Sequence, residues 1–156
     1  MSRGIIHLPV TMASDLLTRS KSKANEWLNS NIDQESKNQI RALLAKEDPK
    51  DLIDCFYKNL EFGTGGLRGV MGVGPNCINQ YTVGVATQGL VNYLKRTLSA
   101  RPIKVAIAYY SRNQSRLFAR ITADVFSANG IQVYLFSDLR PTPELSFALK
   151  YLGCQC

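Results

Sequence analysis

Short apolar runs alternate with helix-patterned segments in the second half of the chain, and this alternation restricts the fold more than any other feature. Residues 105–109 and 132–136 are short and almost entirely apolar, as expected for strands covered on both faces. Helical patterns of about 10 to 15 residues follow each run, which is typical of crossovers between parallel strands. We therefore predict an α/β fold with three α/β/α layers and an open, mainly parallel (mixed) sheet.

The first part of the chain predicts helices only. Residues 13–61 form an N-terminal helical segment of three helices, two of which have candidate N-caps at Asp33 and Asp48. Residues 1–12 carry no helical or strand pattern, so we expect a loose leader there. A fourth helix, capped by Thr82, is expected to lead from the glycine-rich residues 62–72 toward the first apolar run, and the α/β region is expected over 62–156.

Composition excludes several classes of protein. No run approaches the ~18 consecutive apolar residues that cross a bilayer, and the N-terminus lacks a secretory signal, so we expect a cytoplasmic protein without a membrane partner. His7 is the only histidine, and the cysteines form no CxxC pair, so neither a zinc site nor a histidine-based triad is expected. We expect the four cysteines to remain thiols. They are Cys55, Cys77, Cys154 and Cys156.

The net charge of +7 lies entirely after Phe62. Residues 63–156 contain ten Lys and Arg against three Asp and Glu, and seven of those ten cations are arginines, which suit phosphate and carboxylate groups. An anionic ligand is one interpretation and a solvated basic face is the other. Aromatic residues do not alternate with basic ones as a nucleic-acid platform requires, so no nucleic-acid partner is expected.

Three arginines occupy comparable places in successive connections. Arg68 follows a segment with five glycines in eleven residues, while Arg112 and Arg140 follow the two predicted strands. Because parallel strands end at one edge of a sheet, we expect the three arginines to meet there, beside backbone N–H groups and helix N-termini that favour anions. The glycine segment matches neither GxxxxGK[ST] nor GxGxxG. The predicted phosphate-binding residues are Thr64, Gly65, Gly66, Arg68, Arg112, Arg140 and Thr142.

Three sequence blocks resemble domain I of the α-D-phosphohexomutases. These blocks are FGTGGLRGVMG at 62–72, YTVGVATQGL at 81–90 and LRPTPELS at 139–146. The resemblance is strongest to the branch of bacterial phosphoglucomutase/phosphomannomutases, type-2 phosphoglucomutase and phosphopentomutases. It implies an isomerase of carbohydrate metabolism that performs intramolecular phosphotransfer through a phosphoserine, with Mg²⁺ and a sugar bisphosphate. Glucose, mannose and pentose phosphates all remain open as substrates.

The resemblance carries over residue by residue. Residues 64–68 match the first active-site loop of the family, and Arg112 matches the arginine of an Asp-x-Arg segment whose aspartate is Tyr110 here. Cys77 stands where this branch usually has arginine. A phosphoserine loop and a metal loop do not occur in 1–156, so we expect an incomplete domain I without a catalytic residue or bound cofactor, inactive alone.

Two function classes follow from these observations. In the first, the chain contributes to a sugar-phosphate cleft together with the remaining phosphohexomutase domains, which would be its partners. In the second, the chain is a degenerate, non-catalytic phosphosugar- or anion-binding module, for which Tyr110 and Cys77 are the sequence arguments.

Overall fold

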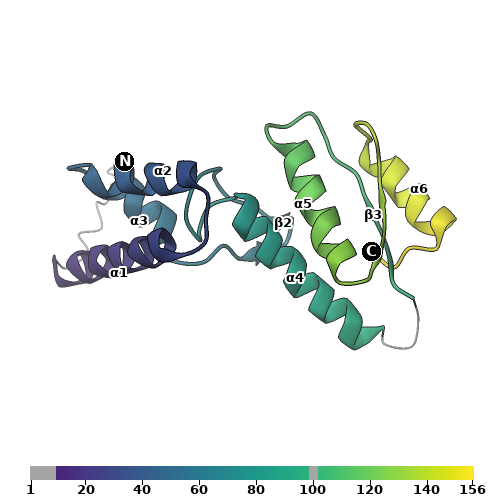
Figure 1. Cartoon of the computed structure of the whole chain (residues 1–156), viewed down its shortest axis with the longest axis horizontal. Coiled ribbons are helices and arrows are strands. Elements are labelled where there is room, and N and C mark those ends of the chain that lie inside the picture. The colour runs from purple at the N-terminus through teal and green to yellow at the C-terminus, as the bar shows by residue number, and fades with distance from the viewer. Residues whose placement is uncertain (1–9, 99–101) are drawn as a thin grey trace, which may run out of the picture. The chain divides into compact units, whose positions relative to one another are not determined.

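The structure is a computed structural model that describes residues 10–98 and 102–156 (Figure 1). It divides into two compact units, Met1–Asn79 and Gln80–Cys156. The division falls after Asn79, whereas the start of the glycine-rich residues suggested a boundary between residues 61 and 62. The glycine-rich residues therefore belong to the same compact unit as the N-terminal helices.

The first unit contains the three predicted helices, α1 (Val10–Asn29), α2 (Gln34–Ala45) and α3 (Lys50–Phe56). Their buried core is an apolar cluster that includes Ala24, Ile40 and Phe56, with Trp27 packed edge-on against Phe56 at a ring-centroid distance of 6.0 Å. Helix α1 begins at Val10, so the last three residues of the leader expected over 1–12 belong to the helix. Residues 10–13 contain neither Gly nor Pro, so nothing in them stops the helix. The rest of the expected leader, with His7, lies outside the described residues.

Of the two predicted aspartate caps, Asp33 is confirmed and Asp48 is wrong by one residue. Asp33 is the N-cap of α2, and its side chain accepts a hydrogen bond from the backbone N–H of Ser36 at 2.8 Å. The N-cap of α3 is Pro49, and Asp48, one residue earlier, still accepts a hydrogen bond from the backbone N–H of Lys50 at 2.9 Å. These bonds satisfy amides that have no partner within the first turn of a helix.

The glycine-rich residues form a short hairpin followed by a folded loop. Strands β1 (Phe62–Gly63) and β2 (Gly66–Leu67) pair antiparallel around Thr64 and Gly65, and Gly66 has a φ of +87°. Further along, Gly74 has a φ of +105°, and a β-carbon there would lie 2.6 Å from the carbonyl oxygen of Cys55. Positive φ and so close an approach both require glycine at this position.

The second unit has the predicted α/β order, with α4 (Gln80–Thr97), β3 (Lys104–Ile107), α5 (Ser115–Ala128), β4 (Gln132–Leu135) and α6 (Thr142–Leu152). Strands β3 and β4 are parallel, with Lys104 opposite Gln132 and Ile107 opposite Leu135. Figure 1 shows α5 on one side of this pair and α6 on the other, which gives three layers. The predicted α/β class is therefore confirmed.

The predicted start of the fourth helix is also wrong. Helix α4 begins at Gln80, so Thr82 lies within its first turn and is not the N-cap. Asn79, which precedes the helix, is also a residue type that favours helix starts, and the sequence offers no means of choosing between the two.

Helices α4 and α5 pack on each other through a core that includes Val91 and Phe126, together with Val105 of β3. A two-way amide pair also joins these helices: the Asn129 side chain donates to Gln88 Oε1 at 2.8 Å, and Gln88 donates to Asn129 Oδ1 at 3.3 Å. Near the other edge of β3, Gln155 N donates to Lys104 O at 2.9 Å. Within residues 10–98 and 102–156, no helix is both long enough and apolar enough to cross a membrane.

Candidate functional site

The predicted phosphate-binding residues are divided between the two units. Residues 64–68, including Arg68, lie in the first unit, whereas Arg112, Arg140 and Thr142 lie in the second. The meeting of all three arginines therefore stays a prediction. Within each unit, however, the local geometry is defined.

In the first unit, the Arg68 side chain lies along the hairpin. A β-carbon added at Gly65 would be 3.6 Å from both Cδ and Nη1 of Arg68. The absence of a side chain at Gly65 therefore leaves the backbone of the turn directly beside the guanidinium. Thr64 and Gly65 are exposed at the tip of this hairpin, so backbone amide, hydroxyl and guanidinium donors are available in one small region.

Arg68 also lines a cavity of about 770 Å³ in the first unit. The wall includes Lys46 and Lys58 as further cations, but also Asp51 and Asp54. Lys46 Nζ lies 2.6 Å from Asp51 Oδ2, and this hydrogen bond and the charge of Lys46 hold the pKa of the Asp51 carboxyl below its usual range. The cavity is therefore of mixed charge, with Arg68 at the side that continues into the hairpin.

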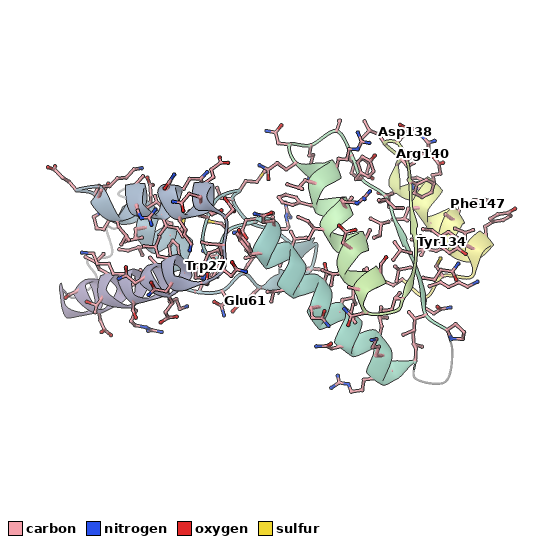
Figure 2. All side chains as sticks on the ribbon, viewed as in Figure 1. Trp27, Glu61, Tyr134, Asp138, Arg140 and Phe147 are labelled. Atoms are coloured by element: carbon pink, nitrogen blue, oxygen red, sulfur yellow. The ribbon has the colours of Figure 1, made fainter. Side chains whose placement is uncertain are left out.

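In the second unit, the loops that carry Arg112 and Arg140 follow neighbouring parallel strands and contact each other. Arg140 N donates to Tyr109 O at 3.3 Å, and the Tyr109 hydroxyl donates to Ser137 O at 2.8 Å. A hollow of about 370 Å³ lies against these loops, and Arg112, Arg116 and Asp138 are among its lining residues. Figure 2 shows Asp138 and Arg140 together at this end of the second unit.

The Arg140 side chain contacts residues that are close to it in the sequence. Its Nε lies 3.0 Å from Glu144 Oε1, its Nη1 donates to Leu139 O at 3.0 Å, and its guanidinium carbon lies 6.0 Å from the centre of the Phe136 ring. Glu144 lies in the first turn of α6, and Arg140 precedes the N-cap of that helix by one residue. An anion that binds Arg140 must therefore compete with Glu144 or share the guanidinium with it.

Tyr110 connects the Arg112 loop to the beginning of α6. Its hydroxyl oxygen accepts a hydrogen bond from Thr142 N at 2.9 Å and is also hydrogen-bonded to the Thr142 hydroxyl. The bonds to the side chain and the backbone of Thr142 lower the pKa of Tyr110, and the nearby charge of Arg112 acts in the same direction. The tyrosine thus uses an N-terminal amide of α6 that would otherwise be open to an anion.

The backbone between Arg112 and α5 adopts an uncommon conformation. Gln114 is the residue before α5 and has a φ of 58°, in the left-handed region that non-glycine residues seldom occupy. Such a conformation costs about 1 kcal/mol or more and persists only where its surroundings hold it. The loop that presents Arg112 therefore has a restricted backbone.

Sequence reasoning missed one close pair of reactive side chains. Cys77 Sγ donates to Cys55 Sγ at 3.3 Å, and both thiols line the 770 Å³ cavity beside Arg68. This bond lowers the pKa of Cys55 and raises that of Cys77, because the proton that Cys77 donates stabilises a thiolate on Cys55. The two cysteines are 22 positions apart, so no CxxC spacing indicated the pair.

A metal site was not expected, and the described part of the chain contains no group of three or more His, Cys, Asp or Glu side chains placed to hold an ion. The described residues therefore do not fit the Mg²⁺ that the family resemblance implies.

The chain resembles known proteins over most of its length. Residues 59–156 match the family model for phosphoglucomutase/phosphomannomutase, alpha/beta/alpha domain I. Human phosphopentomutase is 35% identical over 141 residues, which is 86% of this chain and 23% of the relative. Phosphoglucomutase of Staphylococcus epidermidis is 34% identical over 82% of this chain and 22% of the relative.

A third relative, glucose 1,6-bisphosphate synthase of Mus musculus, is 33% identical over 97% of this chain and 25% of the relative. The chain thus spans about a quarter of the length of the curated relatives that it matches. No solved structure matches it.

Proposed function

Because the chain belongs to the phosphoglucomutase/phosphomannomutase family, we propose that it supplies phosphate-binding groups of an enzyme that transfers a phosphoryl group on sugar phosphates. The observation that carries the proposal is the placement of the Arg112 and Arg140 loops. They follow neighbouring parallel strands and are joined by the bond from Arg140 N to Tyr109 O. Ligands of open α/β sheets bind beyond this edge of the strands.

Arginine is suited to the task that we assign to it. A guanidinium can donate two parallel hydrogen bonds to phosphate oxygens and keeps its charge at all physiological pH values. In phosphoryl transfer, such groups orient the phosphate and stabilise the charge that spreads over its oxygens in the transition state. We assign this binding and orienting role to Arg112 and Arg140 in the second unit.

The hairpin of the first unit has a comparable role in the proposal. Arg68 lies against Gly65, and the exposed Thr64 offers a hydroxyl group next to them. Backbone N–H groups in a glycine-rich turn can bind anions without a competing side chain. Residues 1–156 do not contain the phosphorylated nucleophile. In our proposal, the residues that bind Mg²⁺ and the sugar bisphosphate also lie outside residues 1–156.

Titration of the ¹⁵N-labelled chain with inorganic phosphate, a hexose phosphate and a pentose phosphate tests the proposal. We expect saturable NMR shifts at residues 64–69, 112 and 140. Arg112→Gln should weaken binding by about one to two orders of magnitude, because a hydrogen bond to a charged group contributes about 1.5–3 kcal/mol. Arg96→Gln, which removes the same charge from the last turn of α4, should change the affinity little.

Equal effects of Arg112→Gln and Arg96→Gln, with shifts scattered over the basic surface, would overturn the proposal. Those results would identify a general basic face. A preference for one of the two sugar phosphates would in addition narrow the substrate class.

A non-catalytic phosphosugar- or anion-binding module is the second candidate. The observation that favours it is Tyr110, which replaces the expected carboxylate and binds Thr142. The gene sequence after codon 156 separates the two candidates. Continuation into a Thr-Ala-Ser-His-Asn-Pro segment supports the enzyme, and a stop codon supports the module.

A further inference from the structure

Cys55 and Cys77 hold their sulfur atoms 3.3 Å apart. Cys55 lies in α3, and Cys77 lies in the loop that follows the glycine hairpin. A disulfide has an S–S distance of about 2.05 Å, so the two atoms must approach by only a little more than 1 Å to form one. All four cysteines of the chain are described, and all are thiols in this structure.

The backbone immediately before Cys77 is attached to α3. Asn76 N donates to Cys55 O at 3.0 Å, and the Asn76 side chain donates to Asp54 O at 2.7 Å. Two residues further toward the N-terminus, Gly74 approaches the same Cys55 carbonyl so closely that no β-carbon fits. These contacts keep the two cysteines together without a covalent bond between them.

The pair is accessible to a small reagent from the cavity. Both cysteines line the 770 Å³ space, in which Cys55 is half-buried and Cys77 is 3% exposed. Cys55 is the better nucleophile of the two, because the hydrogen bond from Cys77 stabilises its thiolate and lowers its pKa. Cys77 is then in position to attack any mixed disulfide that forms on Cys55.

We propose that Cys55 and Cys77 are a modification site at which a low-molecular-weight disulfide converts the two thiols into an intramolecular disulfide. The Cys55 thiolate attacks one sulfur of the reagent, whose S–S bond breaks and releases one thiolate. Cys77 then loses its proton and attacks the sulfur of Cys55, which releases the second thiol of the reagent. Two protein thiols lose two electrons and two protons, and the reagent gains both as two thiols.

The inference does not depend on the proposed function. It requires only the two sulfurs, the contacts that hold them together and the cavity. The loop closed by the new bond contains the hairpin and Arg68, so oxidation would also add a covalent restraint around that segment. In a reducing compartment such a bond would form transiently, as for other regulatory thiol pairs.

The test uses the full 156-residue chain with Cys154→Ser and Cys156→Ser, so that only Cys55 and Cys77 can react. The protein is equilibrated with glutathione and glutathione disulfide in graded ratios, alkylated and analysed by intact and peptide mass spectrometry. We expect loss of two hydrogens, a peptide that links Cys55 to Cys77, and reversal by reduced glutathione. Addition of Cys77→Ala should leave Cys55 carrying one glutathione.

Two results would overturn the proposal: both thiols unmodified at every ratio, or glutathione retained on Cys55 while Cys77 is still alkylated. A measurement without a substitution at either position provides a second test if the Cys77→Ala protein does not fold. A trivalent arsenical such as phenylarsine oxide should bind one molecule per chain and protect both thiols from alkylation. Protection of neither or only one thiol would contradict the proposed geometry.

Discussion

Replacement of Gly74 by alanine should destabilise the first unit strongly, and the reason is local. Gly74 is buried and has a φ of +105°, and an added β-carbon would lie 2.6 Å from Cys55 O and 3.1 Å from two atoms of the Phe56 ring. The carbonyl cannot retreat easily, because it accepts the hydrogen bond from Asn76 N at 3.0 Å. The Phe56 ring is itself fully buried in the core of the unit.

Two costs add at this position. Positive φ costs a residue with a β-carbon about 1–2 kcal/mol, and overpacking a tightly filled site costs about 1–3 kcal/mol more. We therefore expect Gly74→Ala to lower the free energy of unfolding by about 2–5 kcal/mol, a large part of the ~5–15 kcal/mol that is usual for a domain.

Gly66→Ala is the matched control in the same unit. Gly66 has a φ of +87°, but no described heavy atom lies within 4 Å of the position of its β-carbon. In this variant the free energy of unfolding should fall only by the cost of positive φ, about 1–2 kcal/mol. The difference between the two variants therefore isolates the contact with Cys55 O and Phe56.

Urea unfolding monitored by tryptophan fluorescence measures this difference. Trp27 is the only tryptophan, and it packs edge-on against Phe56 in the core of the first unit. The signal therefore reports on that unit. Equal losses of stability in Gly74→Ala and Gly66→Ala would refute the reasoning, because the loop would then have room for a β-carbon at Gly74.

Two further predictions concern charged side chains of the same unit. Asp33→Ala removes the bonds to Ser36 N and Ser36 Oγ at the start of α2, and should cost about 1 kcal/mol in the same fluorescence assay; Asp33→Asn should cost clearly less, and equal costs would contradict a capping role. The pKa of Asp51 lies below its ordinary value of 3.8, so its favourable interaction with Lys46 should be present above that value and lost as pH falls through the lowered pKa. Carboxyl ¹³C NMR should show that Asp51 titrates below its ordinary pKa. Lys46→Met should return the pKa of Asp51 to the ordinary range. An unchanged pKa of Asp51 in this variant would contradict the ion pair.

The fold was predictable to the extent that it depends on local patterns. Continuous apolar runs identified β3 and β4, and Asp33 marked a helix start that the structure contains. These signals arise within a few residues, so one sequence is enough to show them. The start of α4 was not predictable in this way, because Asn79 and Thr82 are both suitable cap residues.

The candidate site was predictable only in part. Positions of arginines after strands follow from chain order. The ion pair of Arg140 with Glu144 does not follow from the helical i+4 rule, because Arg140 precedes α6. The contact of Tyr110 with Thr142 joins residues 32 positions apart, and the Cys55–Cys77 pair spans 22 positions. Such contacts depend on how elements pack, for which no local spacing rule exists.

The amide pair between Gln88 and Asn129 restricts how α4 and α5 can be aligned along each other. Apolar side chains alone would tolerate several alignments of two helices, since a shift of one turn, about 5.4 Å, again brings apolar faces together. Only one alignment, however, lets each amide both give and receive a hydrogen bond. Any slipped arrangement would leave half-buried amide groups without these bonds, so this pair selects a single pairing of the helices even if its net contribution to stability is small.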